Sequence, residues 1–184
     1  MLITQARMSD VDTIMAWRIE RTAWMRARGY DQWSVPLPRS AIAATVTSGQ
    51  TWMVWDGDTP CATITLTAWT NVDELWKPSF DSADALWLPE DDPADALYAA
   101  KMIIPRVYSG HGLGAEILDW AAGRAFEAEL SWLRFDAWTS NTALHAYYRS
   151  LGFQHVRTVT TRVSGACFQR PAQPYAGNRL KTQD

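Results

Sequence analysis

The sequence predicts a mixed α/β fold in which helices cover both faces of one sheet. Segments with a strand period alternate with segments with a helix period, in the order βααββ, a loop, and then βαβαββ. The chain has 184 residues, 47% of them hydrophobic and 20% charged, which suffices for one ordinary globular domain. We therefore expect a single domain over residues 1–184, with its core from about 2 to 170.

The first third of the chain is expected to contain two helices and three strands. The predicted elements are a strand over 2–6, a helix from 9 to about 28, a short helix over 38–46, and strands over 51–55 and 61–68. Ser9 and Asp12 have the spacing of a capping box, and Gly29 supplies a helix stop. The turn Asp56-Gly57-Asp58 separates two alternating segments, which predicts a β-hairpin.

Residues 70–95 show no clean period and exceed the length of most loops. We expect an inserted, lid-like loop here. Its acidic residues are Asp73, Glu74, Asp81, Asp84, Glu90, Asp91, Asp92 and Asp95, against a single Lys77. Such a rim would attract a cationic amine, although a solvated acidic loop explains the same pattern.

The second half returns to regular alternation. The predicted elements are strands over 97–104, 132–138, 153–163 and 166–170, and helices over 113–129 and 141–151. Leu113, Ile117 and Ala121 share one side of the first helix, as burial against a sheet requires. Asn141 is a typical N-cap and Gly152 a typical stop for the second helix. A polar tail is expected over 171–184.

Charge and composition exclude several functions. A formal net charge of -3 argues against nucleic acid as a partner. No apolar run approaches the length of a membrane span and the N-terminus lacks the pattern of a signal peptide, so a cytoplasmic protein is expected. Cys61 and Cys167 have no metal or redox spacing, which predicts two reduced thiols and no metal site.

Three alternate glycines, Gly110, Gly112 and Gly114, lie between a predicted strand and a predicted helix. Without side chains, the loop can aim its N–H groups at a phosphate, where the helix dipole also favours negative charge. The last glycine is not followed by the Lys-Ser/Thr pair of a P-loop. The spacing and late position also fit a dinucleotide fold poorly. Coenzyme A is the third phosphorylated ligand to consider.

Two segments carry a family resemblance. Residues 109–115 resemble the pyrophosphate motif Arg/Gln-x-x-Gly-x-Gly/Ala of the GNAT acyltransferase superfamily, with Gly112 and Gly114 at its glycine positions and Ser109 where Arg or Gln is usual. Residues 141–153 resemble the later motif Asn-x-x-Ala-x-x-x-Tyr-x-x-x-Gly-Phe. The resemblance implies a mostly antiparallel sheet that splays at the cofactor strand.

The same resemblance implies acetyl-CoA as the cofactor. The cofactor-binding residues it indicates are Met102, Ile103, Ile104, Ser109, Gly110, His111, Gly112, Leu113, Gly114, Ala115, Asn141 and Tyr148. In the family, the strand before the loop binds the pantetheine arm through its backbone and polarises the thioester carbonyl.

Tyr148 matches the position that commonly protonates the departing thiolate, because a phenol with a pKa near 10 is a suitable donor to that sulfur. A core tyrosine beside Tyr147 is the alternative. No motif fixes the general base, which leaves Asp95, Asp92 and Asp136 as candidates. Asp136 could instead pair with a neighbouring arginine, Arg134, across a sheet face.

The acceptor site is the least defined part. Tyr30, Gln32, Trp33 and Trp87 could form an aromatic wall for the substrate, although a tryptophan-rich core would explain the same residues. We expect an acetyl-CoA-dependent N-acetyltransferase acting on the primary amine of a small molecule. Alternatives are a protein lysine or N-terminal acetyltransferase, an enzyme using a longer acyl donor, and a non-catalytic acyl-CoA sensor. Dimers are common in this family, so a homodimer is among the expectations.

Overall fold

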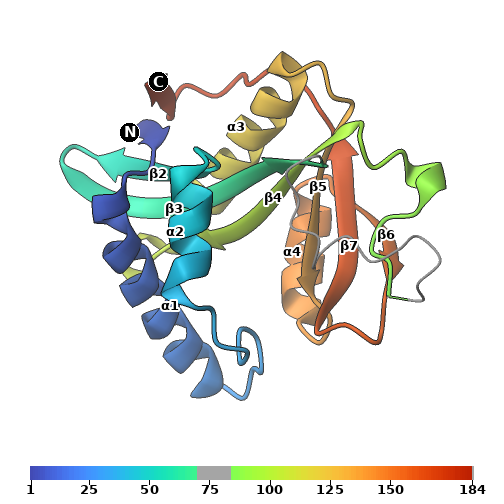
Figure 1. Ribbon diagram of the computed structural model, residues 1–184, viewed down its shortest axis with the longest axis horizontal. Coiled ribbons are helices and arrows are strands. Elements are labelled where there is room, and N and C mark those ends of the chain that lie inside the picture. The colour runs from blue at the N-terminus through green and yellow to red at the C-terminus, as the bar shows by residue number, and fades with distance from the viewer. Residues whose placement is uncertain (70–83, 184) are drawn as a thin grey trace. The chain divides into compact units, whose positions relative to one another are not determined.

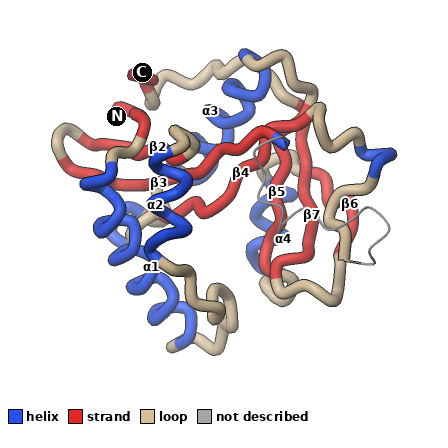
Figure 2. Tube along the Cα trace, in the orientation of Figure 1, coloured by secondary structure: helices blue, strands red, loops and turns tan. Residues whose placement is uncertain are grey.

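The computed structural model describes residues 1–69 and 84–183. The helices are α1 (Val11–Arg26), α2 (Arg39–Thr47), α3 (Leu113–Glu127) and α4 (Thr142–Ser150). The strands are β1 (Leu2–Gln5), β2 (Thr51–Asp56), β3 (Thr59–Ala68), β4 (Ala96–Ile103), β5 (Trp132–Trp138), β6 (Gln154–Thr158), β7 (Ser164–Pro171) and β8 (Lys181–Gln183). Helices and strands are interspersed along the chain (Figure 2), which confirms the mixed α/β fold.

The chain divides into two compact units. The first contains Met1–Leu66, Lys101–Trp120 and Ala176–Asp184, and the second contains Thr67–Ala100 and Ala121–Tyr175. Strand β4 and helix α3 each contribute residues to both units. Each unit is described by itself below.

In the first unit the strands follow the order β3-β2-β1-β8. β2 is antiparallel to both β1 and β3, which confirms the predicted hairpin. β8 lies parallel to β1, with Leu2 opposite Lys181, so the two ends of the chain run side by side in Figure 1. This last strand falls in the segment for which the sequence predicts only a polar tail.

Helices lie on both faces of this first group of strands. Met53 of β2 belongs to a buried cluster with Val11 and Ile14 of α1 and Ile42 of α2. The preceding residue, Trp52, points the other way, and its ring centroid lies 5.2 Å from that of Trp120 on α3. Because successive side chains of a strand point to opposite faces, β2 is covered by α1 and α2 on one face and by α3 on the other.

The second unit has the strand order β6-β7-β5-β4. β7 is antiparallel to β5 and β6, whereas β4 is parallel to β5. Phe168 of β7 packs toward α4, where its ring lies 5.6 Å from that of Tyr148. The adjacent Cys167 points to the opposite face and is buried with Leu86 and Trp87. The described end of the predicted insertion therefore covers a sheet face as part of the core.

Helix boundaries follow local backbone chemistry. The Asn141 side chain accepts a hydrogen bond from Leu144 N at 3.0 Å, and Gly152 follows α4 with a φ of 82°, as the sequence predicts. The predicted capping box at Ser9 and Asp12 is wrong. A 3₁₀ turn over Met8–Asp10 precedes α1, and Asp10 accepts from Arg7 N at 2.7 Å.

Both cysteines are buried and their thiols lie against backbone carbonyls. Cys61 Sγ is 3.3 Å from Val54 O, and Cys167 Sγ is 3.3 Å from Leu86 O. Burial is the main cause that raises the pKa of Cys61 to about 11 and that of Cys167 to about 12, with further contributions from Asp56 and Asp136 respectively. Among the described residues, no helix is long and apolar enough to cross a membrane.

Candidate active site

The glycine loop connects β4 to α3 within the first unit. A 3₁₀ turn over Arg106–Tyr108 leads into it, and α3 begins at Leu113, where the sequence predicts a helix. Gly110 and Gly112 have φ angles of 83° and 75°, and a Cβ added at either would meet no atom within 4 Å. Backbone conformation, rather than crowding, therefore accounts for glycine at both positions.

The start of α3 offers backbone donors. Glu116 N donates to Gly112 O at 3.2 Å, which places Gly112 at the N-cap of the helix. The N–H groups of Leu113, Gly114 and Ala115, which precede this bond, have no partner within the helix itself. Together with the helix dipole they form a site suited to a phosphate or pyrophosphate. Leu113 and Gly114 of this first turn are buried, and Ala115 and Glu116 are partly buried.

Strand β4 contains a backbone irregularity close to this loop. Lys101 has a φ of 51°, which is unusual for a residue with a side chain and is typical of a β-bulge. The register of β4 with β5 covers three residue pairs, from Ala96–Trp132 to Tyr98–Arg134. The remainder of β4, which includes the predicted cofactor residues Met102 and Ile103, lies beyond this register.

A C-terminal arginine holds the glycine loop. Arg179 Nη1 donates to His111 O at 2.9 Å within the first unit. Leu180 beside it is buried, and the β8 residue Thr182 accepts from Trp120 Nε1 at 2.9 Å. Sequence reasoning missed this contact because neither motif reaches the last fourteen residues.

Tyr148 lies on α4 of the second unit in an aromatic environment. Its ring centroid is 4.5 Å from that of Phe135 on β5 and 6.2 Å from that of Phe153. Burial raises the pKa of Tyr148 well above 10, and the neighbouring charges of Tyr147 and Asp136 raise it further. The phenol therefore stays protonated throughout the neutral range. Asn141 of the same motif serves as the N-cap of α4.

The three candidate bases, all in the second unit, differ in their surroundings. Asp95 accepts a hydrogen bond from Ser131 N at 2.8 Å, and its hydrogen bonds with Ser131 lower its pKa. Asp92 follows the 3₁₀ turn Pro89–Asp91 with a left-handed φ of 45° and is exposed. Asp136 is partly buried on β5 opposite Cys167. Asp95 is thus a poor proton acceptor, and Asp136 lies near enough to Tyr148 to affect its pKa.

The neighbouring Arg134 has its own partners. Its guanidinium donates to Asp92 O at 3.0 Å, to Gln169 Oε1 at 3.0 Å, and to Asp91 O. It also stacks on Trp87, with Cζ 4.7 Å from the ring centroid. Arg134 is therefore a core residue that anchors the described end of the insertion to β5.

The predicted acceptor residues fall into different settings. Tyr30 and Trp33 follow α1 in the first unit, and the Arg18 guanidinium lies 4.2 Å from the Trp33 ring. Gln32 is partly buried between them. Trp87 in the second unit is 4% exposed and packs against Tyr98, which is the position of a core residue. Residues 70–83 of the expected lid lie outside the described residues.

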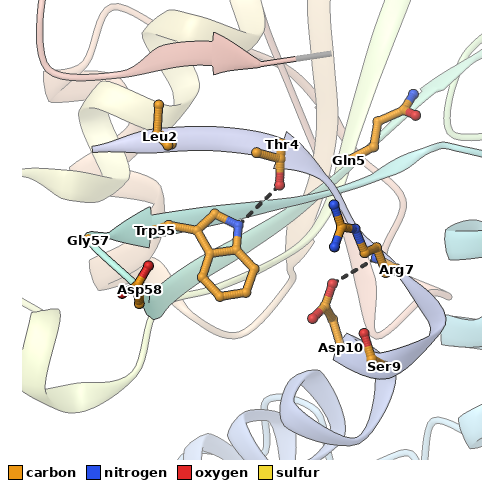
Figure 3. Close-up of a pocket in the computed structure, with 9 residues that line it drawn as sticks. All are labelled: Leu2, Thr4, Gln5, Arg7, Ser9, Asp10, Trp55, Gly57 and Asp58. Carbon is orange, nitrogen blue, oxygen red and sulfur yellow. Dashed lines mark hydrogen bonds between the residues drawn. The ribbon is translucent and has the colours of Figure 1, made fainter.

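A depression of about 350 Å³ lies in the first unit, between the start of the chain and the β2–β3 turn. Figure 3 draws the residues that line it. Its lining residues are Leu2, Thr4, Gln5, Arg7, Ser9, Asp10, Trp55, Gly57 and Asp58. Trp55 Nε1 donates to Thr4 Oγ1 at 3.1 Å across it. None of the site residues expected from the sequence lines this depression. Within the described part of the chain, no group of three or more His, Cys, Asp or Glu residues is placed to hold a metal ion.

Comparison with known proteins gives a consistent result. The sequence profile of the acetyltransferase (GNAT) family matches residues 15–153. The uncharacterized N-acetyltransferase YesJ of Bacillus subtilis (strain 168) is 24% identical over 148 residues, which cover 79% of this chain and 77% of that protein.

Solved structures share the fold at low sequence identity. A GNAT-family acetyltransferase from Streptococcus agalactiae 2603 has a TM-score of 0.72 and 19% identity, covering 93% of this chain and 95% of its own. The PaiA N-acetyltransferase from Thermoplasma acidophilum, solved in complex with coenzyme A, has a TM-score of 0.65 and 13% identity, covering 92% and 97%.

Proposed function

Because this chain belongs to the GNAT acetyltransferase family and is an acyltransferase, we propose that it transfers an acetyl group from acetyl-CoA to the primary amine of a small molecule. The observation that carries the proposal is the glycine loop, whose left-handed Gly110 and Gly112 lead into the N-terminus of α3. A coenzyme A-type cofactor suits this loop, because a pyrophosphate matches its backbone donors.

The proposed reaction joins the amine nitrogen to the acyl carbon and breaks the bond between that carbon and sulfur. The amine must lose a proton, and the departing thiolate must gain one. When bound, acetyl-CoA supplies the activated acyl group. The backbone of β4 around Lys101 would orient the donor, because residues beyond Tyr98 lie outside the register with β5.

We propose Tyr148 as the general acid that donates a proton to the departing thiolate. Burial keeps the phenol protonated in the neutral range, so a proton is present when the thiolate departs, and the same burial makes the phenol a weaker acid than an exposed tyrosine. We propose Asp136, rather than Asp95, as the general base that removes the proton from the amine. The lowered pKa of Asp95 makes it a weaker base than an ordinary aspartate, and its carboxylate already accepts the Ser131 N–H.

Coenzyme A release from acetyl-CoA should be measured with a panel of small primary amines, with lysine-containing peptides, and with peptides bearing free N-termini. Turnover with small amines and none with peptides is the expected result. A preference for peptides would support the protein acetyltransferase alternative instead. Acetyl-CoA binding without turnover on any amine would contradict the proposed reaction and support a sensor.

A further inference from the structure

The inner face of α1 carries arginines where apolar residues are expected. Val11, Ile14 and Met25 of this helix are buried. Arg18 and Arg21 continue the same face, because the steps 14, 18, 21 and 25 have the spacing of one helical stripe. Both arginines are partly buried rather than exposed. Charged side chains that face the protein interior are normally paired with an opposite charge or a hydrogen-bonding group.

Further cations gather around the next turn of the helix. The Trp24 ring has three guanidinium carbons near its centroid: Arg28 at 4.1 Å, Arg21 at 4.9 Å and Arg106 at 5.4 Å. Arg106 belongs to the turn between β4 and the glycine loop. The arginine cluster is defined here as Arg18, Arg21, Arg28 and Arg106.

The cluster has little compensating negative charge. Within the residues that the structure describes, its guanidinium groups form no ion pair with a carboxylate, and the acidic group acting on Arg21 is the exposed Glu20 beside it. Burial lowers the pKa of Arg18 to about 10, and burial together with the charge of Arg106 lowers that of Arg21. Like charges held together in this way favour the binding of an anion.

An unused donor lies at the centre of the same group. Trp24 Nε1 is buried and makes no hydrogen bond to any residue that the structure describes. Buried donors without a partner are uncommon in folded proteins. Arginine side chains that stack on a ring can shift to admit a ligand, and the ring's N–H would then be available to an oxyanion alongside the guanidinium forks.

We propose that the arginine cluster binds an anionic group, a carboxylate or a phosphate, carried by the acceptor amine. The acceptor is then a small amine of the amino acid or phosphoamine type. This inference rests on the proposed function and narrows it. It reverses the expectation from the acidic residues of 70–95, which would favour a purely cationic amine. Arg106 supports binding of the acceptor by the cluster. It adjoins β4 and the glycine loop, to which acetyl-CoA is assigned, so an amine bound at the cluster would lie near the donor.

The test compares paired amines of which only one member carries an anionic group, with rates corrected for the different pKa of each amine. Amino acids are paired with their carboxamides, such as phenylalanine with phenylalaninamide, and ethanolamine is paired with O-phosphoethanolamine. We expect at least a tenfold higher kcat/KM for the anionic member of one pair. The first pair reports a carboxylate and the second a phosphate.

The variants are Arg21→Gln on α1 and Arg106→Gln outside it, with Arg26→Gln on the exposed side of α1 as the control. Either test variant should raise KM for the anionic amine about tenfold, with kcat and the neutral amine unaffected. The control should change neither value. Because Arg106 lies outside the helix, its variant decides the question if Arg21→Gln does not fold.

Other outcomes overturn the inference separately from the proposed function. Turnover of neutral amines without an anionic preference refutes the inference and leaves the function intact. A raised Kd for coenzyme A in the variants assigns the cluster to the cofactor's phosphates. If the variants lose a preference of the wild type for succinyl-CoA over acetyl-CoA, the arginine cluster binds the acyl group of the donor instead. If no amine is acetylated, calorimetric titration of the anionic amines into the coenzyme A complex still decides, because the variants should weaken that binding about tenfold.

Discussion

The Asp91 carboxylate is held by the Arg157 guanidinium of β6, with Arg157 Nη2 donating to Asp91 Oδ1 at 3.0 Å and Nη1 donating to Oδ2. Leu88 N donates to the same carboxylate at 2.6 Å. The side chains are 13% and 25% exposed. Because these contacts join residues 66 positions apart, they fix the described end of the insertion to the sheet of its unit.

We expect Asp91→Asn to lower the free energy of unfolding by about 2 kcal/mol, because it removes charge-assisted hydrogen bonds to a partly buried group. Chemical denaturation measures this. Asp12→Asn, which disrupts the exposed pair with Arg39, is the control and should leave stability within error. Equal effects of the two changes would contradict a structural role for the Asp91–Arg157 contact.

The same variant should show a pH-dependent difference. Burial alone would raise the pKa of Asp91, but the hydrogen bonds from Arg157 and Leu88 outweigh it and lower the pKa below 3.8. The stabilisation is therefore fully present above about pH 4 and is lost as the pH falls through the lowered pKa. Stability curves of wild type and Asp91→Asn should converge in acid, and a constant gap would refute the assignment.

Gly112→Ala should weaken coenzyme A binding about tenfold, because alanine resists a φ of 75° by roughly 1–2 kcal/mol and the loop must adjust. Gly57→Ala is the matched control, since Gly57 has a φ of 59° and equally open space around its Cα, but lies in the β2–β3 turn. Both variants should lose similar stability in thermal unfolding. Calorimetric titration with coenzyme A should detect a weaker Kd for Gly112→Ala alone.

Tyr148→Phe should lower kcat about a hundredfold while leaving the Kd of coenzyme A unchanged, because phenylalanine keeps the ring contacts and removes only the proton donor. The neighbouring Tyr147, which is 39% exposed, supplies the control variant Tyr147→Phe. Steady-state rates with a fixed amine measure both. An unchanged kcat for Tyr148→Phe would remove this residue from the proposed mechanism.

The wild-type rate should also rise with pH and show no fall below pH 10 that originates from Tyr148. Burial raises the pKa of this phenol, so the protonated form persists at pH values where the amine has become neutral. A rate profile from pH 6 to 10 tests this expectation. A descending limb that disappears in Tyr148→Phe would show that the phenol ionises more easily than its surroundings imply.

Arg179→Gln should raise the Kd of coenzyme A several-fold with little change in melting temperature, because its bond to His111 O is exposed to solvent and steadies the loop. Lys181→Gln, in the adjacent β8, is the control for loss of a nearby positive charge. If both changes weaken binding equally, long-range charge is responsible and the bond to the loop is not.

Much of the fold was predictable because its signals are local. Asn141 and Gly152 mark the ends of α4 through backbone chemistry that needs no tertiary partner. Strand β8 was not predictable from its three exposed residues, because its existence depends on pairing with β1. The start of α1 was misassigned because Arg7 and Asp10 close a 3₁₀ turn that contains Ser9, and α1 begins after it at Val11.

The site divides in the same way. The glycine loop is a backbone motif, so its spacing in sequence carries its geometry. The general base and the acceptor residues depend on tertiary neighbours, as Asp95 and Trp87 illustrate through their contacts with Ser131 and Tyr98. The arginines of α1 could have been identified from the sequence, because Arg18 and Arg21 share a helical stripe with Ile14.

The two buried cysteines have a practical consequence for every rate measurement proposed above. Released coenzyme A is conveniently detected with a chromogenic disulfide that reacts with thiolates. Cys61 and Cys167 are both fully covered, and their raised pKa values keep them in the unreactive thiol form at neutral pH. The native enzyme therefore contributes almost no colour of its own, and a slow background that grows with protein concentration would report unfolded molecules in the sample.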